Sequence, residues 1–327
     1  MEDAIATIAS AQGCPQVRLD KKCVAVFCAD NGVVAQGVTQ SQQDVTAIVT
    51  ENFCSGQTSV CAMARAAGAE VFPVDIGVAA TVSGKGLRIH KIANGTADIT
   101  QGPAMSREQA ADAILYGMQM VGELKQQGYN LIATGEMGIG NTTTSAAVLA
   151  ALTGASVEKV TGRGGGLTDR GFETKKRVLR QALALHRPDA GDPIGVLAAV
   201  GGLDIAAMTG LFLGCAHEGL AAAVDGYISI VAALCAVRLC PRVRDVLFLS
   251  HASYEIGYRL AARELGLEPC LLLGMRLGEG SGCPLLFRVM QGACAVLNHM
   301  ATFPEAAIED GYLAPIRQGD AFTVDKS

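Results

Sequence analysis

Short apolar runs alternate with longer helical patterns along this chain. The apolar runs that predict buried strands lie at 22–28, 70–78, 131–134, 245–250 and 270–273. The patterns that predict helices lie at 4–11, 45–67, 106–125, 145–152, 194–200, 203–215, 224–239 and 284–299. Strands that alternate with helices in this way predict an α/β fold with a mainly parallel sheet flanked by helices.

The stretch from Gly135 to Thr144 connects a predicted strand to a predicted helix. Gly138 and Gly140 allow the backbone to come close to a ligand, and the first turn of a helix offers free N–H groups. This pattern predicts a phosphate site, although a tight turn without a ligand has the same composition. No Walker lysine follows the glycines, and Thr143 stands where a dinucleotide fingerprint has its third glycine.

Two glutamates lie in glycine-rich turns that follow predicted strands. Glu136 precedes Gly138, and Glu279 lies between two glycines just before the helix at 284–299. A phosphate repels a neighbouring carboxylate, so a function explains Glu136 better than a structural role does. Ligands of parallel α/β sheets bind beyond the carboxyl ends of the strands, so we expect Glu136 and Glu279 to converge there.

Other polar positions have two open interpretations. Asp30 and Asp75 follow predicted strands and either contact a ligand or form turns. The glycine cluster at 162–166 is either an anion-binding loop or a plain linker. Arg163 within it and Lys175 in the helix that follows favour the anion-binding loop, because a phosphate needs positive charge nearby.

Composition limits the class of protein. The chain has 327 residues, 50% of them hydrophobic, and a formal net charge of −5. No uninterrupted apolar run reaches the roughly 18 residues of a membrane span, so we expect no span. The negative charge and the lack of a basic run argue against nucleic acid as a partner. The 11 cysteines are scattered without a Cys-x-x-Cys pair, which predicts core residues in a reducing cytoplasm rather than disulfides or a zinc site.

Several motifs together resemble the signatures of one family. They are GPAM at 102–105, GEMGIGNTT at 135–143, GRGGGL at 162–167, GGL at 201–203, VDG at 224–226 and RLGEGSG at 276–282. In this order they resemble the nicotinate-nucleotide–dimethylbenzimidazole phosphoribosyltransferases of cobamide assembly. The resemblance implies transfer of ribose 5-phosphate from nicotinate mononucleotide to a lower-ligand base such as 5,6-dimethylbenzimidazole. The products would be α-ribazole 5′-phosphate and nicotinate.

The resemblance also implies a role for each site residue. Glu279 matches the general base of the family, and Glu136 matches a glutamate near the ribose and the nicotinate. The residues implied to hold the nucleotide phosphate are Gly138, Ile139, Gly140, Asn141, Thr142, Gly164 and Lys175. The residues implied to approach the lower-ligand base are Ser41, Gln42, Met137, Ser253 and Leu277. The implied partners are small-molecule substrates, with no cofactor and no metal.

The implied architecture has two parts. A large Rossmann-like domain over residues 21–284 carries the active site, and a smaller helical domain is formed by residues 1–20 and 285–327. The family forms homodimers, so we expect one here. One departure from the family concerns Asn31, which stands where the family usually has a histidine.

Alternative functions stay open. The chain could be a non-catalytic or heteromeric partner subunit, or a transferase specific for a purine or a phenol. The presence of Glu279 argues against the non-catalytic subunit. The incomplete glycine fingerprint argues against an oxidoreductase that uses a dinucleotide. His251 has no neighbouring constellation for nucleophilic catalysis, which favours a hydrogen-bonding role over that of a general base.

Overall fold

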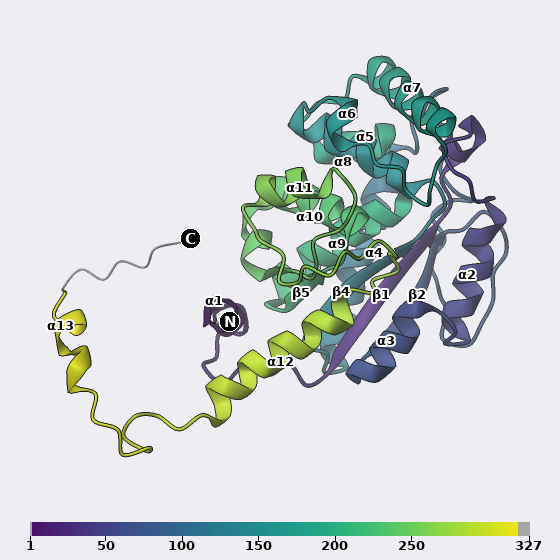
Figure 1. Cartoon of the computed structure of the whole chain (residues 1–327). Coiled ribbons are helices and arrows are strands. Elements are labelled where there is room, and N and C mark those ends of the chain that lie inside the picture. Colours follow the sequence, from purple (N-terminus) through teal and green to yellow (C-terminus); the bar gives the residue numbers. More distant parts are fainter. Residues whose placement is uncertain (1, 320–327) are drawn as a thin grey trace.

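In the computed structural model, which describes residues 2–319, one six-stranded sheet forms the centre of the protein (Figure 1). The strands are β1 (Lys22–Ala29), β2 (Glu70–Gly77), β3 (Arg88–Ile89), β4 (Leu131–Met137), β5 (Ala221–Val224) and β6 (Leu247–Leu249). Their order in the sheet is β3-β2-β1-β4-β5-β6, and every pairing is parallel. The α/β fold with a parallel sheet, predicted from the alternation of strands and helices, is confirmed.

The central strand β1 is buried on both of its faces. Cys23, Ala25 and Phe27 belong to the core on one face of the sheet. Val24 and Val26 belong to the core on the other face. Because successive side chains of a strand point to opposite faces, burial on both sides explains why β1 is a continuous apolar run. The order of the strands reverses between β1 and β4, and doubly wound sheets bind ligands at such a point.

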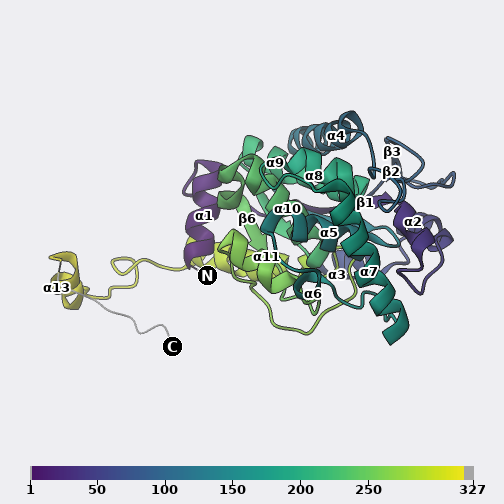
Figure 2. The same ribbon diagram turned by 90° about the horizontal axis from the view of Figure 1, so that it is seen from above.

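Helices lie on both sides of the sheet (Figures 1 and 2). On one side are α1 (Glu2–Gln12), α2 (Asp44–Cys54), α3 (Ser59–Ala67) and α12 (Cys283–His299). On the other side are α4 (Arg107–Gln126), α5 (Asn141–Thr153), α7 (Asp169–His186), α8 (Pro193–Val200), α9 (Leu203–Glu218), α10 (Tyr227–Leu239) and α11 (Tyr258–Leu265). Shorter elements are α6 (Val157–Val160), α13 (Ala314–Arg317) and the 3-10 turns Gly32–Gln36, Pro241–Val246 and Gly311–Leu313. Within residues 2–319, no helix is long and apolar enough to cross a membrane.

The single helix predicted over 45–67 is wrong, since this segment forms the two helices α2 and α3. Gly56 takes a left-handed φ of 71° between them, and the side chain of Thr58 caps the start of α3. The capping box predicted at the start of α4 is confirmed. The Ser106 side chain accepts from the N–H of Gln109, and the Gln109 side chain accepts from the N–H of Ser106.

Two predictions late in the chain are also wrong. The helix predicted over 224–239 begins only at Tyr227, because Val224 is the last residue of β5, a strand that the pattern did not predict. A four-residue alanine strand cannot be told from a helix by periodicity. The segment 270–273 is not a strand, and Leu272 is 81% exposed. The strand before it is shorter than predicted and begins at Leu247, after a 3-10 turn.

The two ends of the described chain pack against the sheet, and the C-terminal end then extends away from it. Ile8 of α1 and Leu286 of α12 share a core with Val24 of β1. Beyond α12 the chain extends away from the sheet in both views (Figures 1 and 2). The division into a domain over 21–284 and a smaller domain from the chain ends stays a prediction, and residues 320–327 lie outside the described part.

Candidate active site

Glycine and small polar residues form the connection from β4 to α5. Gly140 has a φ of 93° and caps α5, so the helix begins at Asn141, earlier than predicted. The N–H of Ile139 donates to the Thr46 hydroxyl over 3.1 Å. The N–H of Asn141 donates to the Gly138 carbonyl over 3.0 Å. These two amides therefore fix the loop itself, and a phosphate would use other N–H groups of the first helical turn and nearby side chains.

A buried lysine lies next to this loop. Lys175 of α7 is 0% exposed, and its Nζ donates to Thr142 Oγ1 over 2.9 Å. Burial lowers the pKa of Lys175 to about 8, and the charge of Glu255 acts in the opposite direction. Gly164 packs against both groups, since a Cβ there would lie 2.9 Å from Thr142 Oγ1 and 3.6 Å from Lys175 Nζ. The segment around Gly164 thus borders the lysine, which favours the anion-binding loop over the plain linker.

Glu136, at the end of β4, is buried in a cluster with a second acid. The Asn141 side-chain amide donates to Glu136 Oε2 and also to Asp204 Oδ2, the latter over 3.1 Å. Burial raises the pKa of Glu136 to about 8, and the nearby charges of Asp204 and Asp225 raise it further. Burial likewise raises the pKa of Asp204 to about 6. The two acids therefore share one amide, and at pH 7 Glu136 is mainly protonated whereas Asp204 is mainly ionised.

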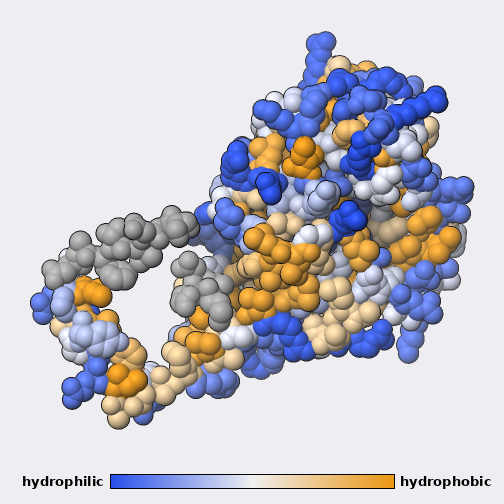
Figure 3. Space-filling model, viewed as in Figure 1, coloured by the Kyte–Doolittle hydropathy of each residue, from blue (hydrophilic) through white to orange (hydrophobic). Residues whose placement is uncertain are grey.

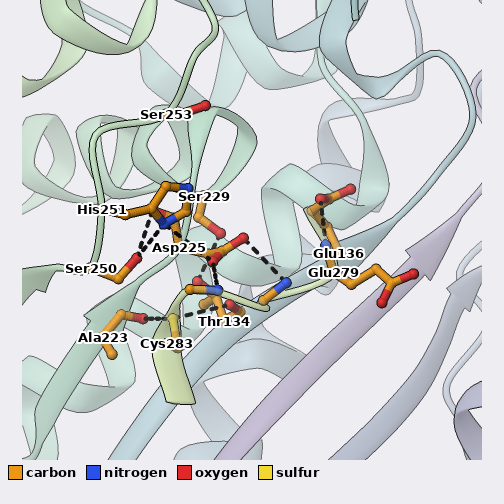
Figure 4. Close-up of polar contacts among 12 residues, drawn as sticks. Thr134, Glu136, Ala223, Asp225, Ser229, Ser250, His251, Ser253, Glu279 and Cys283 are labelled. Carbon is orange, nitrogen blue, oxygen red and sulfur yellow. Dashed lines mark hydrogen bonds and ion pairs between the residues drawn. The ribbon is translucent and has the colours of Figure 1, made fainter. Parts of the chain in front are cut away.

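Glu279 lies in the turn before α12, directly beside Glu136. Its N–H donates to Glu136 Oε1 over 3.4 Å, so the expected convergence of the two glutamates is observed. Glu279 has a left-handed φ of 63°, and its neighbours Gly278 and Gly280 have φ of 87° and 89°. The half-buried carboxylate is directed away from Glu136 (Figure 4) and accepts from the N–H of Val60 over 3.3 Å. Burial raises the pKa of Glu279.

A cavity of about 290 Å³ opens where these turns meet. All the site residues predicted from the sequence line it, with the exception of Lys175 and Gln42. Lys175 contacts the lining residue Thr142 from behind. Ser41 and Gln42 are both exposed, and only Ser41 reaches the cavity. Met137, Ser253 and Leu277, which were implied to approach the base, share this cavity with the two glutamates.

Comparison with known proteins agrees with this geometry. A model of the phosphoribosyltransferase family DBI_PRT matches residues 1–308. The chain belongs to this phosphoribosyltransferase family. The family resemblance inferred from the motifs is thereby confirmed.

Individual relatives match over nearly the whole chain. The nicotinate-nucleotide–dimethylbenzimidazole phosphoribosyltransferase of Clostridium perfringens is 44% identical over 324 residues, which cover 99% of this chain and 90% of that protein. The protein of the same name from Acetivibrio thermocellus is 45% identical over 309 residues, covering 94% of this chain and 88% of that protein. The crystal structure of CobT from Thermus thermophilus has a TM-score of 0.91 at 39% identity, covering 95% of this chain and 93% of that one.

In this phosphoribosyltransferase the structure adds two aspartates that the sequence analysis did not assign to the site. Asp204 lies in the first turn of α9 and contacts Asn141. Asp225 directly follows β5 and lines the cavity. A signal for Asp225 was present, since an aspartate and a glycine follow β5 just as Asp30 and Gly32 follow β1. The signal was missed because β5 was not predicted, and its last residue, Val224, was assigned to the helix over 224–239.

The remaining strand-end residues hold loops in place. Asp75 Oδ1 accepts from the N–H of Val78 three residues on and so forms a turn, whereas Asp30 Oδ2 accepts from the N–H of Ala79 and links the end of β1 to the loop after β2. Asn31, in the place of the family's usual histidine, is fully buried. Its amide donates to the Ile139 carbonyl over 3.3 Å and its oxygen accepts from Thr144 Oγ1 over 3.3 Å. A neutral amide thus ties β1 to the loop before α5.

Two further features limit the chemistry of the site. His251 Nδ1 lies 3.0 Å from Ser250 Oγ and 3.9 Å from Asp225 Oδ1, so both neighbours meet the same ring nitrogen. This arrangement differs from a nucleophile–histidine–acid triad, in which the two partners use different nitrogens. Within the described residues, no group of three or more His, Cys, Asp or Glu side chains is arranged to hold a metal ion.

Proposed function

We propose that this protein transfers the ribose 5-phosphate of nicotinate mononucleotide to a benzimidazole-type base, giving an α-ribazole 5′-phosphate and nicotinate. The observation that carries the proposal is the meeting of Glu136, Glu279 and the Thr142–Lys175 pair around one cavity. Acids on one side and a buried cation on the other match a nucleotide with a cationic pyridinium ring and an anionic phosphate. The names of the relatives from Clostridium perfringens and Acetivibrio thermocellus support the same substrates.

The phosphate would bind between the first turn of α5 and Lys175. A helix N-terminus carries partial positive charge, and Lys175 adds a full charge through Thr142 Oγ1. The lysine is buried without an ion pair to any described residue, so its charge is available to a ligand. An incoming phosphate would restore a partner to the buried ammonium group.

Glu279 would act as the general base. Nicotinate leaves from a cationic ring nitrogen, so the electron pair of the broken C1′–N bond neutralises that nitrogen and no acid is needed. One nitrogen of the incoming base forms the new bond to C1′, and its other ring nitrogen loses a proton to the Glu279 carboxylate. Attack opposite the leaving group converts the β nucleotide into an α product. A positioned base of this kind typically contributes about 10²–10⁴-fold to the rate.

Glu136 would act on the ribose and pyridinium end of the nucleotide. Because its pKa is raised to about 8, Glu136 is mainly protonated at pH 7, which limits repulsion of an entering phosphate. A pyridinium cation bound beside it favours the ionised carboxylate. The resulting negative charge would then stabilise positive charge that develops on the ribose as nicotinate leaves.

The test uses purified protein, nicotinate mononucleotide and a panel of benzimidazole, purine and phenolic bases, with free nicotinate followed by chromatography. Nicotinate release that depends on an added base supports the transferase, and its rate across the panel ranks the bases. Nucleotide binding without release would favour a non-catalytic partner subunit and overturn the proposal. A change in the redox state of an added dinucleotide would favour an oxidoreductase.

We also propose that the protein is a homodimer. Apolar side chains are exposed on the outer part of α12 and along the arm that follows it (Figure 3), among them Leu297, Met300, Phe303 and Tyr312. Surfaces of this kind are usually covered in an assembly. Light scattering should give twice the mass of one chain, and Leu297→Glu should shift the protein towards monomer. Leu115→Glu, at an exposed leucine of α4, serves as the matched control.

A cytoplasmic location belongs to the same proposal. The 11 cysteines are free, and seven of them, such as Cys23 and Cys283, are buried among apolar residues. Free thiols in these numbers fit a reducing compartment. Fractionation of the producing cells, with this protein followed by antibody, checks the location.

A further inference from the structure

Besides Glu136, which accepts from the N–H of Glu279, a second buried carboxylate holds the turn that carries Glu279. Asp225 Oδ1 accepts from the N–H of Gly282 over 2.8 Å, and Asp225 Oδ2 accepts from the N–H of Gly280 over 3.2 Å. Figure 4 shows Asp225 between His251 and this turn, with both of its oxygens directed to the turn. Asp225 is 2% exposed, so its carboxylate has exchanged water for these two amides.

We propose that Asp225 is a positioning residue for Glu279, which sets the place of the general base without touching the substrate itself. The inference rests on the proposed function, because it gives Glu279 the role of base. It assigns to Asp225 a role in the speed of proton removal and not in nucleotide affinity.

The backbone of the turn explains why such a clamp is needed. Glu279 has a left-handed φ of 63°, a conformation that non-glycine residues rarely adopt and that the surroundings must enforce. Gly280, next in the chain, has a φ of 89°, and its N–H donates to Asp225 Oδ2. Without the clamp, the peptide after Glu279 is free to rotate towards a more ordinary conformation. The carboxylate of Glu279 would move with it.

Packing on the other side of the turn leaves little room for a different anchor. A Cβ at Gly135 of β4 would overlap the Glu279 carbonyl, and a Cβ at Gly280 would lie 3.0 Å from Gly135 Cα. The turn therefore rests on β4 on one side, through its backbone and the Glu136 carboxylate, and on Asp225 on the other. It can relax only towards the cavity, where the reacting atoms must be aligned.

A carboxylate suits this position better than its neutral isostere. Both amides of the turn are donors, and a carboxylate offers an acceptor oxygen to each of them. In Asp225→Asn one of the two acceptors becomes an NH₂ group, which faces an N–H without a possible hydrogen bond. The substitution keeps the volume of the side chain and loosens the hold on Gly280 or Gly282. It also removes a negative charge that raises the pKa of Glu136, and the double variant described below separates the two effects.

Asp75 provides a matched control within the same sheet. It is 1% exposed, lies at the carboxyl end of β2, and accepts from the N–H of Val78 over 2.8 Å. It differs from Asp225 in that it contacts neither Glu279 nor the turn around it. Asp75→Asn therefore tests whether loss of a buried strand-end carboxylate is enough to lower turnover.

The experiment compares wild type with Asp225→Asn, Asp75→Asn, Glu279→Gln and the double variant Asp225→Asn/Glu279→Gln. Base-dependent nicotinate release gives kcat and KM. Titration with nicotinate mononucleotide by calorimetry counts folded sites, so that each kcat refers to folded protein. For Asp225→Asn we expect kcat to fall about 10- to 100-fold, because a displacement of about 1 Å costs roughly that much. Its KM for the nucleotide should stay within about threefold, and Asp75→Asn should keep kcat within about threefold.

The double variant separates positioning from a role of its own. If Asp225 acts through Glu279, the double variant turns over no more slowly than Glu279→Gln alone. Multiplied losses in the double variant, or an unchanged kcat in Asp225→Asn, would overturn the inference. A rise in KM without a fall in kcat would also overturn it. If wild type releases no nicotinate with any base, the proposed function has failed, which the wild-type assay reports before any variant is compared.

Discussion

Replacement of Lys175 by methionine should make the protein more stable and a poorer binder of its nucleotide. The ammonium group is fully buried, and its hydrogen bond to Thr142 Oγ1 does not neutralise its charge. Methionine fills a similar space with an apolar chain. The substitution therefore removes a buried charge whose purpose, in the proposed function, is to meet a phosphate.

The magnitude follows from the pKa. A pKa lowered from 10.5 to about 8 corresponds to about 3 kcal/mol of lost folding free energy below pH 8, at about 1.4 kcal/mol for each pKa unit. Loss of the hydrogen bond from Lys175 to Thr142 lowers the free energy of unfolding by about 1 kcal/mol and so offsets part of this gain. We thus expect Lys175→Met to raise the free energy of unfolding by about 2 kcal/mol and Tm by roughly 3–5 °C.

The same pKa shift predicts how the stability difference between Lys175→Met and wild type depends on pH. Below pH 8 the lysine is charged in both the folded and the unfolded protein, and the folded protein bears the full cost of burial. Between pH 8 and 10.5 the folded protein loses the proton while the unfolded chain keeps it, so wild type gains stability as pH rises. The difference in Tm between Lys175→Met and wild type should therefore shrink across this window.

Nucleotide binding should change in the opposite direction. Lys175 lies behind Thr142 and does not line the cavity, so it acts on the phosphate through its charge rather than through a direct hydrogen bond. Loss of that charge should weaken nicotinate mononucleotide binding by about tenfold in calorimetry, which corresponds to about 1.4 kcal/mol. Lys176→Met is the control, since Lys176 is the next residue of α7 and pairs with Glu173 over 2.7 Å. A lower Tm for Lys175→Met together with unchanged nucleotide affinity would refute the reasoning and make Lys175 a structural residue.

Three further outcomes are expected. Glu279→Gln should lower kcat about 10²–10⁴-fold, while calorimetry still detects nucleotide binding; near-normal turnover would contradict the assignment of the base. Gly135→Ala adds a methyl group against the Glu279 carbonyl and should lower kcat at least about tenfold. An unchanged kcat for Gly135→Ala, measured on protein that unfolds cooperatively, would show that the turn can move freely. Binding of nicotinate mononucleotide at pH 7 should release up to about 0.9 proton per site from Glu136, whose pKa is about 8. Calorimetry in buffers of different ionisation enthalpy measures that release, which should vanish in Glu136→Gln.

Much of the sheet and the loop before α5 could be predicted because local pattern decides them. β1 and the first part of β4, residues 131–133, are apolar on both faces, and the glycines between β4 and α5 allow backbone conformations that other residues rarely adopt. The meeting of Glu136 with Glu279 followed from a topological rule, since ligands collect where parallel strands end. Such a rule needs only the order of elements and not their detailed packing.

The burial of Lys175 could also be predicted in part from the sequence. Val178, Leu179 and Ala182 lie three, four and seven residues further along α7, and all three are buried. Lys175 therefore belongs to the apolar stripe of the helix, whereas Lys176 lies beside it. The role of a lysine on such a stripe depends on what the stripe faces, and that is set by contacts with α5, distant in the sequence.

The clamp by Asp225 on the Glu279 turn could not be read from the chain. Asp225 and Gly280 are separated by 55 positions, and they meet because β5 lies next to β4 in the sheet. Prediction of that contact needs the strand order, and the alanines of β5 resemble a helix. Because the four-residue strand β5 was not predicted, the information that places the aspartate was missing.

Burial of the acids explains how carboxyl groups and a phosphate can share one site, because it raises the pKa of each acid. Burial raises the pKa of Glu136 to about 8, of Asp225 to about 7 and of Asp204 to about 6. At pH 7 Glu136 is therefore mainly protonated, so the cavity that it lines carries less negative charge than an ionised Glu136 would give it. An anionic phosphate can therefore approach Lys175 without strong repulsion from the opposite wall. The pyridinium of the same nucleotide then favours ionisation of the acid that it meets, so the negative charge develops only when the reaction requires it.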